Sequence, residues 1–327
     1  MHAMTYARYG SPSVLEATQV DRPHAGDDEV VVRVRAVGIN PFDLHFLHGD
    51  PYLMRPMMGL GLRKPRRPTI LGSDVAGVVE VVGKNVVRFH EGDEVYSTVG
   101  MGGFAEFVAV RENLLALKPA NTTFEQAAAV PMAATTALQG LRDLGRLQPG
   151  QTVLINGASG GVGSFAVQIA KVLGAAEVTG VCSTNNLELV RSIGADRVID
   201  YTNEDFTRGE RRYDLLVDTV GNHSLRAFAR SVTPTGTLLL VGGGGGRLLG
   251  PVAQILGAKL GAPFLSQKVV TMFARSNGDD LDYLRQLIEA DKLKPVINRT
   301  YPFAEAPEAL RHLETRRARG KIVITIG

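Results

Sequence analysis

Two stretches of the chain differ in how apolar and polar residues alternate. Within roughly the first hundred residues, short apolar runs of strand character are separated by glycine-containing turns, and no long helical pattern occurs. Beyond about residue 122, apolar strand runs alternate with helical segments, which is the pattern of a parallel sheet covered by helices on both faces. The chain therefore predicts an α/β fold with a doubly wound parallel sheet and a second, β-rich domain.

The positions of these runs predict the individual elements. In the first stretch we expect strands at residues 30–37, 76–82, 94–97 and 104–110. In the second we expect strands at residues 152–156, 177–182, 197–199, 215–218 and 237–241, and helices at 162–173, 187–193 and 280–290. Residues 321–326 form a last strand-like run, which we expect to return to the first domain.

A helix start separates the two stretches. Thr122 and Glu125 have the spacing of a capping box before the alanine-rich residues 126–141, within which Pro131 should kink or restart the helix. We therefore expect residues 1–120 and 295–327 to form the β-rich domain, and residues 121–294 to form the sheet-and-helix domain.

Composition narrows the classes of function. The net charge is only +3 over 327 residues, so nucleic acid is not an expected partner. The single cysteine, Cys182, excludes an intrachain disulfide and a cysteine-rich metal site. The N-terminus lacks an apolar signal core and no run of about twenty apolar residues occurs, so we expect no membrane partner and a cytoplasmic location.

The candidate cofactor site begins directly after the strand expected at residues 152–156. There the sequence GASGGVG, at residues 157–163, leads straight into a helix. Small residues in such a turn let the backbone approach a pyrophosphate, and the free N–H groups of the helix N-terminus favour its negative charge. Glycine turns also serve packing alone, but the order of strand, turn and helix favours a dinucleotide. The expected cofactor-binding residues here are Ser159, Gly160, Gly161 and Val162.

The end of the next strand indicates which dinucleotide binds. NAD-preferring sites have an acidic residue about twenty residues beyond the motif, which binds the ribose hydroxyls. Here Ser183 follows the strand, with Thr184, Asn185 and Asn186 after it. Hydroxyl and amide groups can hold a 2′-phosphate that a carboxylate would repel. The sequence therefore favours NADPH over NADH, with Ser183, Thr184 and Asn186 as contacts; these residues could also simply cap the next helix.

Six short motifs spread along nearly the whole chain resemble one protein family. They are GINPFD at residues 38–43, LGSDVAG at 71–77, EGDEV at 91–95, the glycine turn at 157–163, GAD at 194–196 and GKIV at 320–323. Together they are similar to the medium-chain dehydrogenases/reductases, and among these to the zinc-free quinone oxidoreductase branch, whose relatives include lens crystallins and a reticulon-interacting protein. The resemblance implies a Rossmann domain that binds the dinucleotide and a GroES-like catalytic domain.

The resemblance also implies a site without metal. Zinc-dependent alcohol dehydrogenases of the same superfamily carry a cysteine near Asn40, and the sequence GHE where this chain has Gly72, Ser73 and Asp74. The four-cysteine structural zinc lobe expected after Val95 is missing too. Because a catalytic zinc needs three protein ligands, we expect neither zinc nor another metal.

Further cofactor contacts are implied by the resemblance alone. They are Thr136, Tyr201, Gly242, Gly243 and Lys321. Many relatives have lysine where Asn185 stands, so a cationic clamp on a 2′-phosphate is weaker in this chain.

Three residues are candidates for the chemistry. By the resemblance, Asn40 is the polar residue beside the nicotinamide that positions the substrate oxygen. Tyr52 is a second candidate donor to that oxygen, and Asp43 is expected to hold its loop by accepting backbone N–H bonds rather than to react. The apolar, methionine-rich residues 52–62 could form the lip of a hydrophobic substrate cleft or an ordinary packed loop.

The expected function is that of an NADPH-dependent enzyme that transfers hydride to a quinone or an α,β-unsaturated carbonyl. Conjugated acceptors spread the charge that grows on their oxygen, so neutral hydrogen-bond donors suffice without a metal. Two alternatives stay open: an NADPH-binding protein with a structural or regulatory role, and an alcohol dehydrogenase. Many relatives dimerise through sheet edges, and the apolar residues 268–273 are the candidate edge of a homodimer.

Overall fold

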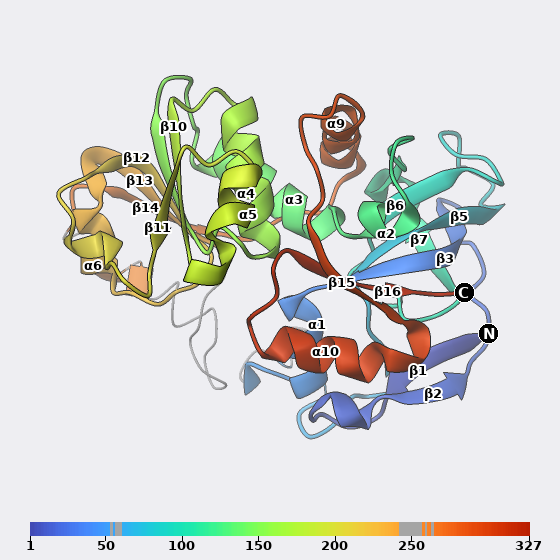
Figure 1. Cartoon of the computed structure of the whole chain (residues 1–327). Coiled ribbons are helices and arrows are strands. Elements are labelled where there is room, and N and C mark those ends of the chain that lie inside the picture. The colour runs from blue at the N-terminus through green and yellow to red at the C-terminus, as the bar shows by residue number, and fades with distance from the viewer. Residues whose placement is uncertain (53–54, 56–60, 242–256, 259, 263–264) are drawn as a thin grey trace. The chain divides into compact units, whose positions relative to one another are not determined.

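The computed structural model describes residues 1–52, 55, 61–241, 257–258, 260–262 and 265–327, which form two compact units (Figure 1). Unit 1 comprises Met1–Thr135, Ser276–Asp291 and Pro295–Gly327, and unit 2 comprises Thr136–Arg275 and Lys292–Lys294. Within the described residues, no helix combines the length and the hydrophobicity needed to cross a bilayer.

Unit 1 is built on two sheets. The larger has β15 (Ile297–Pro302), β16 (Lys321–Thr325), β3 (Glu29–Ile39), β5 (Asp74–Val82), β6 (Glu94–Thr98) and β8 (Leu115–Leu117) in this order, with β7 (Phe107–Arg111) also paired to β3. The smaller has β2 (Glu16–Gln19), β1 (His2–Tyr6) and β4 (Thr69–Ile70). The pairing of β16 with β3, with Ile322 opposite Ile39, confirms that the end of the chain returns to the first domain.

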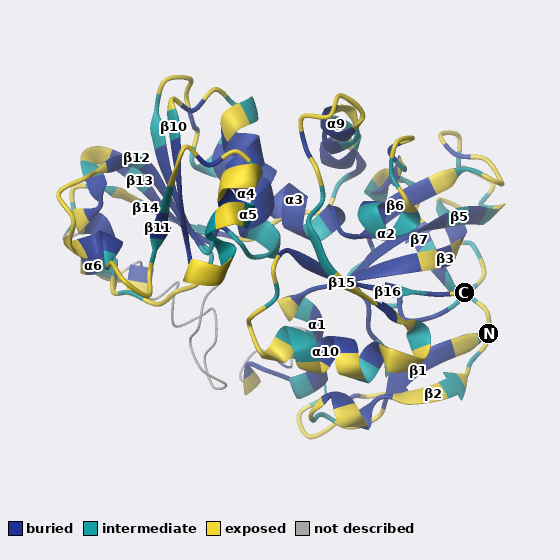
Figure 2. Cartoon of the chain, in the orientation of Figure 1, coloured by how far each residue is buried: buried dark blue, intermediate teal, exposed yellow. Residues whose placement is uncertain are grey.

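The pattern of β3 explains how the core of unit 1 forms. Val32 and Val34 are buried while Arg33 and Arg35 are exposed, so the middle of the strand alternates between core and solvent. The residues before and after this stretch are mostly buried on both faces of the strand (Figure 2). The helices of this unit are α1 (Pro41–His48), α2 (Phe124–Ala128), α9 (Gly278–Glu289) and α10 (Ala306–Glu314). Three-residue 3₁₀ turns lie at Pro12–Val14, Glu112–Leu114 and Phe303–Glu305.

Unit 2 is a parallel sheet whose strands alternate with helices. The strand order is β11 (Arg197–Asp200), β10 (Glu177–Cys182), β9 (Thr152–Asn156), β12 (Tyr213–Asp218), β13 (Val232–Val241) and β14 (Lys268–Met272). Its helices include α4 (Gly161–Val172), α5 (Leu187–Ser192) and α6 (Leu225–Arg230), and α3 (Pro131–Gln139) leads into it through a π-helical turn at Gly140–Leu144. Val153, Leu154 and Ile155 of β9 are fully buried, as a strand covered on both faces requires. The predicted α/β class is confirmed.

The helix start between the two stretches is one residue later than the sequence predicted. Thr123 is the N-cap of α2, accepting the N–H of Gln126, whose side chain in turn accepts the N–H of Thr123. Thr122 instead donates its hydroxyl to the carbonyl of Pro119 at 2.8 Å. The prediction that Pro131 restarts the helix is confirmed, because α3 begins there.

The unit boundaries differ from the expected domain boundaries. Residues 121–135 and 276–291 were assigned from the sequence to the sheet-and-helix domain, but they belong to unit 1. Hydrogen bonds give the reason: Tyr96 of β6 donates its hydroxyl to the carbonyl of Leu281 at 2.6 Å. Asn121 donates its amide N–H to the carbonyl of Ile288 at 3.0 Å. Helix α9 is therefore hydrogen-bonded to other residues of unit 1 near both of its ends.

Candidate functional site

The turn between β9 and α4 contains two positions that only glycine can occupy. Gly157 has φ +84°, and a Cβ there would lie 2.4 Å from Thr219 Oγ1. A Cβ on Gly163 would lie 2.1 Å from the carbonyl oxygen of Gly157, so the first turn of the helix packs directly on the loop. Both constraints keep the backbone tight and free of side chains at this point.

Backbone donors gather at the N-terminus of α4. Gly160 is its N-cap and has no side chain to satisfy the following N–H groups. Within the described residues, the N–H groups of Gly161, Val162 and Gly163 have no hydrogen-bond partner in the protein. Free N–H groups and the positive end of the helix dipole suit a pyrophosphate, so this turn fits a dinucleotide.

The side chain of Asn186 is hydrogen-bonded to two hydroxyl groups beside this turn. Its Nδ2 donates to Ser159 Oγ at 3.0 Å and to Ser183 Oγ at 3.2 Å. Because both hydroxyl oxygens accept, each serine keeps its own hydrogen to donate elsewhere. Asn186 Oδ1 is buried and has no partner among the described residues. Three residues predicted to bind the cofactor therefore lie together: Ser159 and Ser183 each have a hydroxyl hydrogen to donate, and Asn186 has an oxygen to accept.

Thr184 is directed to a carboxylate that the sequence interpretation did not single out. Its hydroxyl donates to Asp200 at 2.6 Å, and Thr202 and Asn203 donate to the same carboxylate. The hydrogen bond from Thr184 is the main reason that the pKa of Asp200 lies below its usual range. Cys182 and Asp200 are opposite each other in the parallel pair β10 and β11, and a strand that ends in aspartate is the signal that could have identified this residue.

The loop from β3 into α1 is held by a buried carboxylate. Asp43 accepts hydrogen bonds from the backbone N–H of Asn40 at 2.8 Å and of Gly72 at 3.1 Å. It also accepts the hydroxyl of Ser73 at 3.1 Å. Complete burial is the largest influence on Asp43 and raises its pKa to about 7, although these hydrogen bonds act in the opposite direction. The geometry gives Asp43 the loop-holding contacts expected of it.

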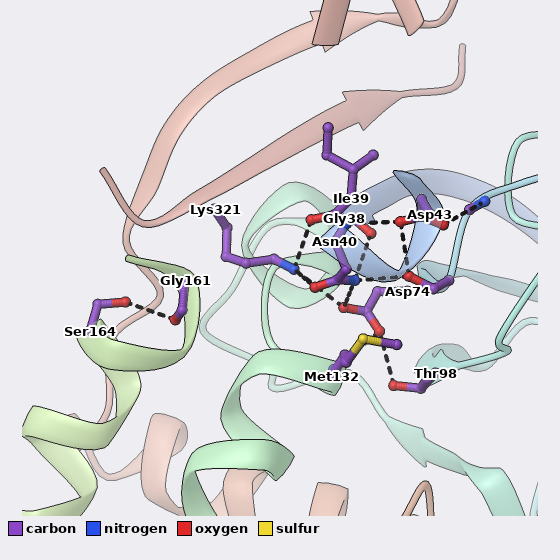
Figure 3. A network of polar contacts seen from close by, with 12 residues as sticks. Gly38, Ile39, Asn40, Asp43, Asp74, Thr98, Met132, Gly161, Ser164 and Lys321 are labelled. Carbon is purple, nitrogen blue, oxygen red and sulfur yellow. Dashed lines mark hydrogen bonds and ion pairs between the residues drawn. The ribbon is translucent and has the colours of Figure 1, made fainter. Parts of the chain in front are cut away.

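Asn40 lies between two charged side chains (Figure 3). Its Nδ2 donates to Ser73 Oγ at 2.8 Å and to Asp74 Oδ2 at 2.9 Å, and its Oδ1 accepts from Lys321 Nζ. Asn40 is 4% exposed. Both amide hydrogens are therefore engaged inside the protein, and the donation to a substrate oxygen that the sequence suggested would require one of these bonds to break.

Lys321 and Asp74 form an ion pair inside unit 1. The Nζ of Lys321 lies 3.4 Å from Asp74 Oδ2 and donates to the carbonyl of Ile39 at 3.1 Å. Asp74 also accepts the hydroxyl of Thr98 at 2.9 Å and the backbone N–H of Met132, the second residue of α3, at 3.1 Å. Desolvation raises the pKa of Asp74 and lowers that of Lys321, and the attraction between the two charges opposes both shifts. The network joins the ends of β3, β5, β6 and β16 to the start of α3.

The remaining predicted site residues are spread over both units. Lys321 was expected to contact the cofactor, but it is 3% exposed and its ammonium group bonds to unit 1 instead. Thr136 is buried in α3, and Tyr201 is 56% exposed after β11. Tyr52 is 39% exposed, and its ring stacks on the guanidinium of Arg55 at 4.3 Å. Gly242, Gly243 and most of the methionine-rich residues 52–62 lie outside the described residues.

No group of three or more histidine, cysteine or carboxylate side chains that could hold a metal occurs in the described part of the chain.

Two family models match the chain. Residues 26–120 match the alcohol dehydrogenase GroES-like domain, and residues 193–324 match the family described as zinc-binding dehydrogenase. The first match lies within unit 1, and the second extends from unit 2 into the C-terminal residues of unit 1.

Individual relatives cover the chain from end to end. A 2-methylene-furan-3-one reductase of Solanum lycopersicum is 37% identical over 99% of this chain and 79% of its own. An NADPH-dependent alkenal/one oxidoreductase of Arabidopsis thaliana is equally similar, and a mitochondrial NAD(P)H oxidoreductase of Mus musculus is 36% identical over 100% and 89%.

Solved structures agree with these sequences. The quinone oxidoreductase of Coxiella burnetii has a TM-score of 0.88 and 27% identity, covering 100% of this chain and 99% of its own. The Escherichia coli quinone oxidoreductase complexed with NADPH has a TM-score of 0.85 and 26% identity, with full coverage of both chains.

Proposed function

The chain belongs to the quinone oxidoreductase branch of the medium-chain dehydrogenases/reductases, and on that premise we propose that it is an enzyme that transfers hydride from NADPH to a quinone or an α,β-unsaturated carbonyl. The observation that carries the proposal is the turn between β9 and α4, where backbone N–H groups without partners in the described chain adjoin the hydroxyls of Ser159 and Ser183. Such a group of open donors suits the phosphates of a dinucleotide. The bound reduced nicotinamide supplies the hydride.

We propose NADPH rather than NADH because of the residues that surround the expected ribose. Ser159 and Ser183 each retain a hydroxyl hydrogen that a 2′-phosphate can accept. The acidic residue that would bind two ribose hydroxyls in an NAD site is replaced by Ser183 at the end of β10. The carboxylate of Asp200 is already hydrogen-bonded to Thr184, Thr202 and Asn203, which compensates part of its charge.

We propose that the reaction proceeds without zinc. Asn40 and Ser73 stand where zinc-dependent relatives carry cysteine and histidine ligands, and here their side chains bond to each other at 2.8 Å. The ammonium group of Lys321 lies beside Asn40 and Asp74, so a cation already neutralises this carboxylate. An amide, a hydroxyl and an ammonium are a poor ligand set for zinc, which prefers thiolate and imidazole.

The remaining roles concern the substrate oxygen and the loop that carries Asn40. A substrate carbonyl oxygen needs a hydrogen-bond donor, and the amide hydrogens of Asn40 are already engaged. We therefore propose Tyr52, the second donor candidate of the sequence, for this role; its ring lies 4.3 Å from the guanidinium of Arg55. Asp43 keeps the loop of Asn40 in place through the N–H groups of Asn40 and Gly72. Quinones and enones fit such neutral donors because conjugation spreads the developing charge.

The proposed activity is tested by mixing the purified protein with NADPH and a panel of quinones, enones and simple alcohols. We expect oxidation of NADPH with quinones or enones, unchanged after treatment with a chelator. Binding of NADPH without turnover on any acceptor would indicate a structural or regulatory role instead. Stoichiometric zinc by metal analysis, with activity on alcohols, would show an alcohol dehydrogenase.

We also propose that the protein forms a homodimer through β14. This strand lies at one edge of the sheet of unit 2, and in the described part of the chain only β13 pairs with it. Val269, Val270 and Thr271 are β-branched and half-buried, and Phe273 beyond them is 64% exposed. Sedimentation analysis should give the mass of two chains; the mass of one chain at micromolar concentration would contradict the proposal.

A further inference from the structure

Three arginine residues line one hollow on the surface of unit 2, which we call the arginine hollow. Its volume is about 460 Å³, within the range of ordinary ligand pockets. The described residues that line it come from α6, from the position before β12 and from the stretch before β14: Arg212, Arg226, Ala229, Arg230, Leu265 and Gln267. None of these lining residues is acidic. The hollow therefore combines positive charge with space for a small molecule.

The charges of the arginine hollow are not neutralised by ion pairs. Arg211, directly before the first of the three arginines, is paired with Glu177. By contrast, no ion pair joins Arg212, Arg226 or Arg230 to a carboxylate within the part of the chain that the structure describes. Three positive charges therefore surround the hollow without a counter-charge from these residues.

Two of the three guanidinium groups are held by neutral carbonyl groups. Arg212 Nη1 donates to the carbonyl of Arg230, and Arg230 Nε donates to the carbonyl of Thr207 at 3.3 Å. These bonds restrict where the two guanidinium groups can lie, but they leave the charge in place. Because a guanidinium group has five N–H donors, each arginine keeps several of them for a ligand.

The sequence around the arginine hollow offers almost no acidic residue. Residues 219–278, which include α6 and β14, contain six lysine and arginine residues and no aspartate or glutamate. Glu210 is two positions before Arg212, but it is exposed and forms no ion pair with Arg212 in the described chain. The excess of positive charge is therefore a property of the sequence as well as of the side-chain positions.

Helix stability does not explain why these arginines are where they are. Arg226 and Arg230 are four positions apart on α6, so their charges lie on the same side of the helix and repel each other. A cation in the last turn suits the helix dipole, which accounts for Arg230. Arg226 lies in the first turn, where a cation opposes the dipole. A bound anion would remove both unfavourable terms.

The arginine hollow lies at the opposite end of the parallel strands from the glycine turn. Arg212 directly precedes β12 and Gln267 directly precedes β14, so the hollow adjoins the N-terminal ends of these strands. The glycine turn follows β9 and adjoins its C-terminal end, and β9, β12, β13 and β14 run parallel. A ligand in the hollow therefore does not compete with a dinucleotide at the turn.

We propose that the arginine hollow is a second anion site of unit 2, which binds two adjacent phosphate groups. The planar guanidinium group can bind two phosphate oxygens at once, so arginine is well suited to this ligand. A single phosphate group carries at most about two negative charges near neutral pH, so two adjacent phosphates match three arginines better. The inference does not rest on the proposed function.

The test is a calorimetric titration of the whole chain with inorganic pyrophosphate, without magnesium and at low salt. The double variant Arg226→Gln/Arg230→Gln removes two guanidinium groups of the hollow. Arg208→Gln/Arg211→Gln is the matched control, because it removes the same charge from two ion-paired arginines of unit 2 that do not line the hollow. Gly163→Ala tests the glycine turn separately, because its Cβ would force that turn to open.

We expect the wild type to bind pyrophosphate and the double variant to bind it about a hundredfold more weakly, since each charge-assisted contact contributes about tenfold. The control variant should keep the wild-type Kd within about threefold, and one pyrophosphate site should persist in Gly163→Ala. Arg226→Lys should bind more tightly than Arg226→Gln but less tightly than the wild type, because an ammonium group keeps the charge without the planar pair of donors. Added salt should weaken binding.

A second comparison identifies the source of the phosphate groups. Vesicles of phosphatidylcholine with and without a phosphoinositide are sedimented with the wild type and with the double variant. Binding to the phosphoinositide vesicles that is lost in the double variant would assign the phosphates to a lipid head group. Binding of pyrophosphate without binding to vesicles would assign them to a soluble anion.

If Arg226→Gln/Arg230→Gln does not fold, Arg226→Gln alone gives the comparison, because Arg226 has no hydrogen bond in the described chain to lose. No heat of binding for pyrophosphate up to the millimolar range would overturn the inference, as would equal Kd values for the double variant and its control. Pyrophosphate binding that disappears only in Gly163→Ala would assign the anion to the glycine turn and overturn it too. All of these results leave the proposed function standing, because that depends on NADPH.

Discussion

The two polar regions of this protein differ in how completely their groups are satisfied. In unit 1 the side chains of Asn40, Asp43, Asp74 and Lys321 bond to one another and to nearby backbone groups. In unit 2 the N–H groups at the start of α4 and the Oδ1 of Asn186 have no partner among the described residues. Buried polar groups are rarely left unpaired, so the second region is the one that awaits a ligand.

The difference also explains how the two regions contribute to function. The network in unit 1 places ionisable groups in the protein interior, where each depends on its partners, so it fixes the loop of Asn40 in one arrangement. The turn in unit 2 contains no charged side chain, and its N–H groups without partners among the described residues suit the negative charge of a phosphate. The network of unit 1 therefore stabilises the structure of the protein itself, whereas the turn of unit 2 has the donors to bind a cofactor.

The largest expected effect is on stability and comes from breaking the ion pair of unit 1. Lys321→Met should lower the free energy of unfolding by about 3–5 kcal/mol at neutral pH, because it leaves Asp74 buried without its counter-charge. In this variant the pKa of Asp74 rises further above its unfolded value, so the lost stability should grow as pH increases. Urea unfolding of the wild type and the variant at several pH values measures the lost stability. A loss that does not change with pH would show that Asp74 does not depend on Lys321 for its charge.

The second effect concerns binding in unit 2. Gly163→Ala places a Cβ 2.1 Å from the carbonyl oxygen of Gly157, so the turn has to open, and the affinity for NADPH should fall by about a hundredfold or more. Gly209→Ala is the control, because its Cβ would meet only the carbonyl oxygen of Phe206 at 3.7 Å. Calorimetry measures the affinity of both variants for NADPH. Equal affinities would show that the turn does not bind the dinucleotide.

A smaller effect tests the choice between the two dinucleotides. Ser159→Ala removes one hydroxyl that Asn186 leaves free to donate, so binding of NADPH should weaken by about tenfold while binding of NADH changes little. Ser192→Ala, which removes a hydroxyl bonded only to the carbonyl of Leu189 on α5, should change neither. Equal losses for both nucleotides would remove the argument for a 2′-phosphate at this position.

A further effect, which arises from Asp43, is a dependence of stability on pH. Its folded pKa of about 7 is above the ordinary value of 3.8, so its contribution to stability is full at low pH and is lost as pH rises toward 7. The stability of the wild type relative to Asp43→Asn should therefore decrease over that range, by about 1.4 kcal/mol for each pH unit between the two pKa values. Asp196→Asn is the opposing control, because the pKa of Asp196 is lowered and its contribution is lost as pH falls.

The glycine turn could be predicted from the sequence because its requirements are local. Gly157 needs a positive φ and Gly163 needs contact with the loop six residues before it, and both follow from the order of strand, turn and helix. Neighbouring residues were harder to separate: Thr122 and Thr123 both suit an N-cap, and only the hydrogen bond to Gln126 distinguishes them. Local patterns therefore identify an element more securely than its first residue.

The network of unit 1 could not be predicted because its partners are distant in sequence. Lys321 and Asn40 are 281 positions apart, and nothing in the strand pattern of residues 321–326 indicates that the lysine turns inward. The place of helix α9 in unit 1 could not be predicted for a similar reason, since its contact with Tyr96 spans 185 positions. Such contacts depend on the assembled sheets.

Titration calorimetry of the purified protein measures whether the open donors of unit 2 bind NADPH. We expect saturable binding of one NADPH per chain, tighter than that of NADH. No heat of binding for either reduced nucleotide, at concentrations up to the millimolar range, would contradict it.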